Sequence, residues 1–407
     1  MTAVGVAATA GAATSGAATE QLRFDRRELS GALADLGVLV PIAVALIVNN
    51  GLSATAVLLP AGLLYVAVAR IYRLPVPVQP LKAFGAIAIA RGIGPDGIAA
   101  GALLTGLIFL FLGSTGLLDV LARGFPKAVV RGVQLSVGLL FLQIAGGLVS
   151  APQASFADAS LGPGYLVAGT AVVAVSALLL RRRPITLVLV ALGIAAMVAR
   201  HQGAVPLGPT PLAIPHLDLD TLAMAFVVLV VPQLPLTFAN ACLATADAAH
   251  AYFGERAERV QPGRLAVSLG TANLLAGAIG GMPVCHGAGG LTAHVTFGAR
   301  TGGAPLALGA ALVLAALVFG AGLAGLLTGF PLPILAGLLV VAGLLHIALL
   351  RDLQGLPSWA LALGVGVLGY AGNLALALAL GLALYWGARG LDALRSTLRR
   401  ADASLGR

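Results

Sequence analysis

The long apolar runs in this sequence constrain its fold more than any other feature. Ten stretches are roughly long enough for a helix to cross a bilayer, and four more are shorter. Two of the shorter stretches, 357–371 and 373–391, form either one broken hairpin or two short spans. The ten are 31–50, 53–70, 97–120, 128–150, 163–181, 184–200, 220–247, 264–280, 305–328 and 332–350, and the shorter four are 78–91, 287–300, 357–371 and 373–391.

The composition agrees with a chain embedded in the lipid bilayer. Only 10% of the 407 residues are charged and the mean hydropathy is +1.00, whereas a soluble chain carries about 25% charged residues. This excludes a cytosolic enzyme, a disordered regulator and a secreted disulfide scaffold. Aromatic residues make up 5%, and the runs do not alternate as barrel strands do. The sequence therefore predicts an all-α integral membrane protein with fourteen transmembrane segments.

The positions of the basic residues predict the orientation. The formal net charge is +9, and Lys and Arg concentrate on the cytoplasmic side of membrane proteins. If the N-terminus is inside, fourteen passes place all Lys and Arg inside except Arg91, Arg200 and Lys82, which lies within the membrane. We therefore expect a multi-pass protein of the cell (cytoplasmic) membrane with both termini cytoplasmic. The charge then needs no nucleic acid partner.

Two interrupted segments indicate an internal repeat. Segments 78–91 and 287–300 are too short to span, each follows an extended piece with Pro-Val, and they are the third and the tenth segment. Seven segments are an odd number, so the halves must insert in opposite orientations, as in many secondary transporters. The predicted parts are a disordered cytoplasmic tail (1–27), a first repeat (28–202), an external loop (203–219), a second repeat (220–391) and a basic cytoplasmic tail (392–407).

The broken segments predict a site for an anion. Extended backbone inside a membrane must find hydrogen bonds within the protein, so we expect the two pieces to pair as a short sheet. Each then leads into a half-helix whose N-terminus carries partial positive charge and free N–H groups. Gly287, Gly289 and Gly290 would let a ligand approach the backbone. The alternative is that these glycines only ease helix packing.

At these residues the chain resembles the molybdate transporter family, a branch of the sulfate-permease-like and uracil-permease-like transporters. The motifs are PVPVQPLKA at 75–83, MPVCHGAGGL at 282–291 and FGARTGG at 297–303, and the resemblance covers 28–391. It implies a seven-plus-seven fold with core and gate domains, and import of molybdate, a tetrahedral oxyanion that sulfate mimics. We expect the cytosolic STAS domain of sulfate permeases to be absent, since only residues 392–407 follow the last segment.

Two polar residues of the first break are candidates for substrate binding. Lys82 either neutralises the oxyanion or forms an ion pair with Asp35, because a charge inside a membrane is costly. Gln79 either donates its amide to the oxyanion or caps the broken backbone.

The other candidates lie nearby in the broken segments and in the eighth segment. Gln233 and Asn240 are seven residues apart and share a helix face, where they line the cavity or bond between helices. Around the second break, backbone contact is favoured over side-chain contact. The remaining candidates are Ala83, Cys285, His286, Gly287, Ala288 and Gly289.

The leading prediction is a secondary active oxyanion importer. Sulfate or tungstate are alternative substrates, and a nucleobase permease of the same fold ranks lower because carboxylates are missing near the centre of the eighth and tenth segments. We expect no enzyme activity, no cofactor and no metal site, and no Walker motif for ATP is present. Protons are the simplest coupling ion, with Asp35 as their carrier unless it forms a permanent pair with Lys82. A homodimer through the gate domains is also expected.

Overall fold

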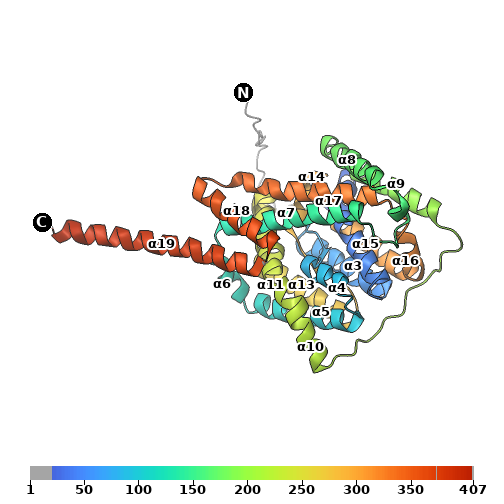
Figure 1. Cartoon of the computed structure of the whole chain (residues 1–407), viewed down its shortest axis with the longest axis horizontal. Helices are drawn as coiled ribbons and strands as arrows, with labels where there is room; N and C mark the ends of the chain where they lie inside the picture. Colours follow the sequence, from blue (N-terminus) through green and yellow to red (C-terminus); the bar gives the residue numbers. More distant parts are fainter. Residues whose placement is uncertain (1–20, 373, 406–407) are drawn as a thin grey trace.

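The protein is almost entirely helical in the computed structural model, which describes residues 21–372 and 374–405. Helices far apart in the sequence pack side by side, and α19 projects away from the rest (Figure 1). One set, called here the core group, has α13 packed along α5 and α15 along α3. Its members are α3 (Ala54–Ile71), α5 (Pro95–Ser114), α13 (Pro262–Ala278) and α15 (Gly303–Val318).

A second set, called here the gate group, is built around α7. Helices α17 and α18 pack along α7, and α8 packs along α17, so that α7 and α17 lie side by side in Figure 1. Its members are α7 (Lys127–Ser150), α8 (Pro163–Leu179), α17 (Leu332–Ile347) and α18 (Leu356–Ala371).

Pairs of glycines bring these helices into close contact. A Cβ added at Gly270 of α13 would lie 2.5 Å from the backbone nitrogen of Leu110 in α5, and one added at Gly309 of α15 would lie 2.7 Å from the carbonyl of Gly62 in α3. Small residues allow such approach inside membranes, where dispersion contacts replace the hydrophobic effect between helices. Much of the high glycine content, 54 residues, therefore serves helix packing.

The structure also contains two long helical runs and two broken segments, each of which begins with a short strand. Residues 26–48 form one run and residues 219–257 another, whose two π-helical stretches surround Pro232 and Pro235. The runs comprise α1 (Arg26–Ala32), η1 (Leu33–Asp35) and α2 (Leu36–Val48), then α10 (Leu219–Ala225), η3 (Phe226–Val230), α11 (Val231–Leu236), η4 (Thr237–Ala244), α12 (Thr245–Phe253) and η5 (Gly254–Ala257). The broken segments are β1 (Gln79–Pro80) with α4 (Lys82–Ala90) and β2 (Val284–Cys285) with α14 (Ala288–Thr296).

The remaining elements connect or flank these parts. They are α6 (Leu117–Arg123), η2 (Ala157–Ser160), α9 (Ile185–Arg200), α16 (Gly320–Leu327), η6 (Ala348–Asp352) and α19 (Leu374–Leu405).

All fourteen predicted segments overlap helices, but several boundaries differ. Segment 97–120 is divided between α5 and α6, and segment 305–328 bends by 107° between α15 and α16. By length and composition, six helices in the described residues can cross a membrane, or seven if the bent pair is one span, and four others are shorter.

The structure describes a part of each predicted tail. Residues 1–20 lie outside the described residues, but the backbone N–H of Arg23 bonds Thr301 Oγ1 at 3.2 Å and helix α1 begins at Arg26. Helix α19 continues to Leu405, through most of the predicted C-terminal tail. The tail of 1–27 was therefore set too long, because Asp25 caps α1 and starts the helix inside it.

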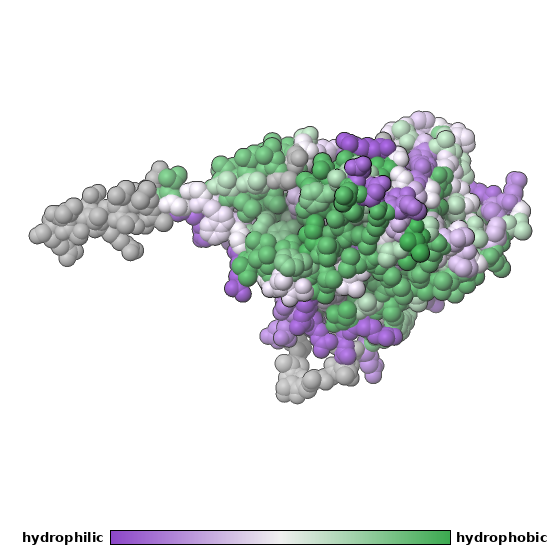
Figure 2. Space-filling view, turned by 90° about the horizontal axis from the view of Figure 1, so that it is seen from below, coloured by the Kyte–Doolittle hydropathy of each residue, from purple (hydrophilic) through white to green (hydrophobic). Residues whose placement is uncertain are grey.

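The outer surface is strongly apolar. Figure 2 shows a broad hydrophobic surface with hydrophilic residues gathered along its borders. Large aliphatic side chains remain exposed on helices of both groups, such as Leu107, Leu314 and Val367 at 51–60%. A soluble monomer rarely exposes an apolar area of this extent, so the surface fits a lipid environment.

The close helix contacts at glycines lead to a prediction about thermal stability. Gly270→Val should lower the thermal unfolding temperature of the detergent-solubilised protein, because forcing a side chain against the backbone of α5 costs roughly 1–3 kcal/mol. The control is Gly147→Val in α7, where an added Cβ meets nothing within 4 Å. Equal melting temperatures for the two variants would contradict the close packing of α5 and α13.

Candidate functional site

The two extended pieces pair with each other inside the protein. Strands β1 and β2 are antiparallel, with Gln79 opposite Cys285 and Pro80 opposite Val284. The side chain of Asn273 in α13 completes the pairing: its Nδ2 donates to Val284 O (2.9 Å) and its Oδ1 accepts from Val284 N (2.6 Å). The buried backbone of the breaks thus obtains the hydrogen bonds that it needs.

Two histidines, one between β2 and α14 and one within α14, bind the extended piece that precedes β1. His286 Nδ1 lies 2.9 Å from Pro77 O, and His294 Nδ1 lies 2.9 Å from Pro75 O. A carbonyl only accepts, so Nδ1 carries the hydrogen in both rings. His286 Nε2 bonds Ser268 Oγ at 2.8 Å, and both its ring nitrogens are therefore engaged in holding the backbone rather than free for a ligand.

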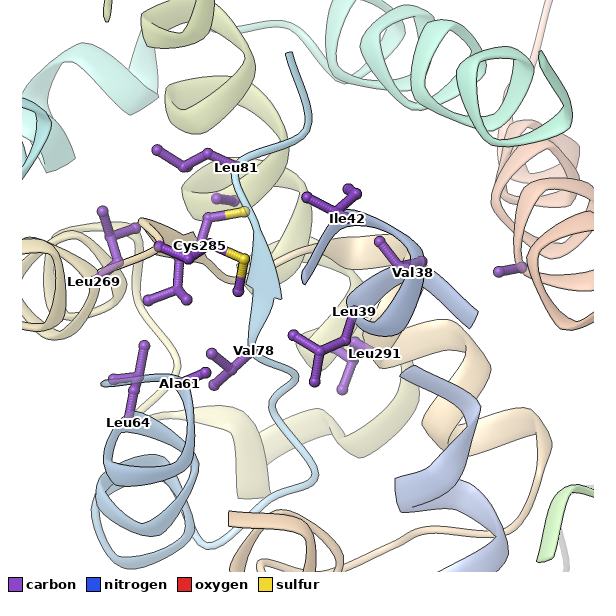
Figure 3. Packing of buried hydrophobic residues seen from close by; sticks show 14 of the residues in the cluster. Val38, Leu39, Ile42, Ala61, Leu64, Val78, Leu81, Leu269, Cys285 and Leu291 are labelled. Atoms are coloured by element: carbon purple, nitrogen blue, oxygen red, sulfur yellow. The ribbon is translucent and has the colours of Figure 1, made fainter. Parts of the chain in front are cut away.

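Apolar side chains close around the strand pair. Figure 3 shows Val78 and Cys285 facing Leu64 and Leu269. On the other side of β1, residues of the first run pack with Leu291 of α14; these are Val38, Leu39 and Ile42 (Figure 3). All belong to one buried cluster, so the polar groups among them are held in a surrounding with little water.

The two nine-residue helices after the strands differ in how their N-termini are capped. In α4 the N–H of Phe84 donates to Gln233 Oε1 (2.9 Å), and Gln233 Nε2 donates to Thr237 Oγ1 (3.0 Å). Gln233 therefore caps α4 from α11. Helix α14 begins after Gly287 and has no side-chain cap, which leaves its first N–H groups without an intrahelical partner.

Three predicted site residues converge on Gly287. A Cβ added there would lie 2.8 Å from Gln79 Oε1, 3.3 Å from Lys82 Nζ and 3.6 Å from Asn240 Nδ2. These side chains come from β1, α4 and η4 and are at most 2% exposed. The structure thus brings Gln79, Lys82, Asn240 and Gly287 together at the N-terminus of α14.

Polar atoms at this point lack partners. Lys82 Nζ, Gln79 Oε1 and Asn240 Oδ1 are buried and make no hydrogen bond to any described residue. Lys82 Nζ lies 5.4 Å from the centre of the Phe141 ring in α7, at the edge of the gate group. The alternative prediction, that Lys82 forms an ion pair with Asp35, is wrong. Among the described residues, Asp35 is bound by other groups.

Asp35 lies at the centre of a second buried cluster. It accepts from Tyr65 Oη (2.5 Å, to Oδ2) and from Gln79 Nε2 (2.6 Å, to Oδ1). His294 Nε2 lies 3.0 Å from Oδ2 as an ion-pair contact that lacks the alignment of a hydrogen bond. Gln79 thus stands between the two clusters, with its NH₂ on Asp35 and its oxygen towards Gly287.

The other predicted residues contribute mainly backbone. Ala83 is the second residue of α4, and Ala288 and Gly289 open α14. The thiol of Cys285 points to Pro80 O at 3.7 Å. Within residues 21–372 and 374–405, no group of three His, Cys, Asp or Glu side chains is placed to hold a metal ion.

Sequence reasoning missed Tyr65 and His294, which contact Asp35 together with Gln79. The sequence could have indicated His294, because an ionisable residue in an apolar segment is a functional candidate, as Lys82 is. Tyr65 gave no such signal, because a tyrosine in an apolar helix is ordinary and only the packing of α3 against η1 shows its role.

Known proteins similar to this chain are transporters. Residues 27–141 and 225–345, more than half of the chain, match the family model described as "Molybdate transporter of MFS superfamily". Molybdate transporter 2 of Arabidopsis thaliana is 29% identical over 78% of this chain and 77% of its own length. Molybdate transporter 1 of Chlamydomonas reinhardtii is 29% identical over 83% of this chain and 86% of its own.

Solved structures show the same fold at lower identity. The transmembrane domain of the cyanobacterial bicarbonate transporter BicA has a TM-score of 0.56 at 19% identity, covering 87% of this chain and 96% of that one. The murine Solute Carrier 26 family member A9 anion transporter has a TM-score of 0.59 at 15% identity, covering 91% and 69%. The matched regions of the family model contain β1, Lys82, Asn240 and Gly287, and the chain belongs to the molybdate transporter family.

Proposed function

We propose that the protein is a secondary active transporter that imports molybdate across the cytoplasmic membrane by alternating access. One observation carries the proposal: Lys82 is 1% exposed, its ammonium makes no hydrogen bond to any described residue, and it lies beside Gly287 at the uncapped N-terminus of α14. An unpaired buried charge is costly. A tetrahedral oxyanion at Gly287 offsets that cost with its own charge and accepts hydrogen bonds from the helix N–H groups.

The chemistry of the site favours a dianion over a nucleobase. Ring N–H groups need free carboxylates, but the acid of the eighth segment, Asp247, is bound to Arg131 at 2.6 Å and Asp35 is bound by Tyr65 and Gln79. Sulfate and tungstate share molybdate's charge and shape and remain alternative substrates. The named molybdate transporters among the relatives favour molybdate.

Helix packing supports a seven-plus-seven inverted repeat with boundaries at 28–202 and 220–391. In the numbering of the fourteen segments, α5 is the fourth and packs on α13, the ninth. A shift of seven turns these numbers into eleven and two, which are α15 and α3, and these two helices also pack on each other. The pair of α7 with α18 and that of α17 with α8 are related in the same way. In this proposal both termini are cytoplasmic, and a homodimer through the gate group stays a prediction.

Alternating access requires the core group, the broken segments and the two helical runs to move together against the gate group. Arg131 of α7 links the two sides: it is 2% exposed and contacts Asp247 of α12 at 2.6 Å and Asp352 of η6 at 2.5 Å. Breaking a buried pair without a new partner is costly. We infer that the Arg131–Asp247 contact belongs to one end state of the movement.

The oxyanion site gives the first prediction on transport. Gly287→Val should abolish molybdate uptake in proteoliposomes while the protein still folds, because the side chain occupies the space between Gln79, Lys82 and Asn240. Gly147→Val is the matched control and should transport normally, since its side chain meets open space. Full transport by a folded Gly287→Val variant would show that the anion does not bind at Gly287.

Lys82 gives the second prediction, and Lys127 is the control because the sequence contains no other lysine. Lys82→Ala should raise the apparent KM for molybdate about ten- to a hundredfold, the worth of a hydrogen bond to a charged group, with a smaller effect on the maximal rate. Lys127→Ala removes the same charge at an exposed position and should leave the KM unchanged. An unchanged KM in Lys82→Ala would exclude contact with the anion.

Proton coupling follows from the position of Gln79. Import of a dianion against an inside-negative potential costs about 2.3 kcal/mol per charge per 100 mV, so a cation must travel with it. While Asp35 is ionised, Gln79 donates to it and turns an oxygen towards Gly287, where it repels an anion. A protonated Asp35 donates to that oxygen instead, and the amide turns its NH₂ towards the oxyanion. Proton binding and anion binding then favour each other.

Asp35→Asn tests this coupling. Asparagine is permanently neutral and can donate to Gln79 Oε1, so exchange of internal for external molybdate should continue. Uptake driven by a proton gradient should be lost, and the pH dependence of exchange should flatten. Tyr65→Phe is the matched control, because it removes one hydrogen bond to Asp35 without changing the charge. Accumulation of molybdate by Asp35→Asn under an imposed proton gradient would exclude Asp35 as the carrier.

A further inference from the structure

A basic cavity lies at the other end of α14, away from the proposed transport site. It has a volume of about 760 Å³, and its walls include five arginines and no acidic residue. The walls come from the start of the first helical run, the α8–α9 loop, α12 and the end of α14. The arginines are Arg23, Arg27, Arg181, Arg182 and Arg300.

The acids closest in sequence to these arginines are already bound. Asp25 accepts from Arg23 Nη2 at 2.6 Å and caps α1, and buried Glu28 accepts from the backbone N–H groups of Arg300 (3.0 Å) and Thr301 (3.3 Å). Arg27 and Arg182 form no ion pair with any acid in the described part of the chain. The cavity therefore carries excess positive charge.

We propose that this cavity is a second binding site for a tetrahedral oxyanion, reached from the cytoplasm. Guanidinium groups bind phosphate-like ions through paired N–H donors, and several like charges around one cavity are stabilised by an anion between them. The position on the cytoplasmic side rests on the proposed topology, which places 181–183 and the N-terminus inside. The binding chemistry itself does not depend on what the protein transports.

The site has a consequence for transport because its walls belong to both moving parts. Arg181 and Arg182 follow α8 of the gate group, whereas Arg27 lies in α1 and Arg300 follows α14. An anion between them attracts both sides and holds them at their present separation. Oxyanion that accumulates in the cytoplasm therefore slows further import, a feedback that needs no additional domain.

The test separates this cavity from the transport site by using the Gly287→Val variant, whose transport site is blocked. Calorimetric titration of the full-length variant in detergent with sodium molybdate should show one saturable site. Adding Arg181→Ala and Arg182→Ala should weaken that binding about tenfold or more, the loss expected for charge-assisted contacts. Arg123→Ala with Arg259→Ala removes equal charge from exposed positions outside the cavity and should leave the affinity unchanged.

The outcomes are distinct. Absence of saturable binding in Gly287→Val, or binding that persists in the Arg181/Arg182 variant, overturns the proposal whether or not the protein transports molybdate. If Gly287→Val does not fold, Lys82→Ala replaces it, and the titration is kept below the molybdate concentration at which the weakened transport site of that variant binds. The titration is repeated with phosphatidylglycerol micelles: if only the lipid binds in an Arg181-dependent manner, the cavity holds a lipid headgroup and the assignment to a soluble ion is wrong.

Discussion

The site depends on one constraint, that extended backbone inside a membrane protein must find its hydrogen bonds within the protein. Strands β1 and β2 meet this need for each other, and their register places Gln79 opposite Cys285, two residues before Gly287. Asn273, His286 and His294 supply the bonds that so short a sheet cannot. The same contacts that satisfy the backbone therefore bring Gln79 and Lys82 to the start of α14. The groups proposed to bind the oxyanion are therefore positioned by backbone hydrogen bonding.

Electrostatics explain why Gln79 separates Lys82 from Asp35. A direct ion pair would satisfy both charges and leave neither for substrate or proton. An amide between them keeps the charges apart and responds to both, since it donates on one side and accepts on the other. Tyr65 and His294 also contact Asp35. In the proposed mechanism, this arrangement leaves the positive charge of Lys82 available to the oxyanion, which a permanent ion pair would not do.

The sequence predicts the elements of this site better than their contacts. Proline and glycine around 75–80 and 281–290 mark both breaks, and a lone lysine in an apolar run marks Lys82. His286 precedes Gly287 and is predicted to contact the anion through its backbone, and its ring bonds Pro77 and Ser268. Gln233 and Asn240 were placed on one face by α-helical spacing, but π-helical turns lie between and around them. Proline removes backbone donors and allows such widened turns. How these turns change the directions of the Gln233 and Asn240 side chains can be learned only from the packed structure.

The two ends of α14 pose opposite problems for an anion. Its N-terminus attracts negative charge and needs only Lys82 to complete a site, whereas its C-terminus carries the negative end of the helix dipole. Arg300 Nη1 donates to the carbonyls of Val295 and Ala299 at that end, at 2.5 and 2.7 Å, and so offsets the repulsion. Nine residues separate the ends by about 14 Å. In the proposed mechanism, an anion that moves from Gly287 towards the basic cavity loses the attraction of one helix terminus and meets the repulsion of the other, which the arginines of that cavity offset.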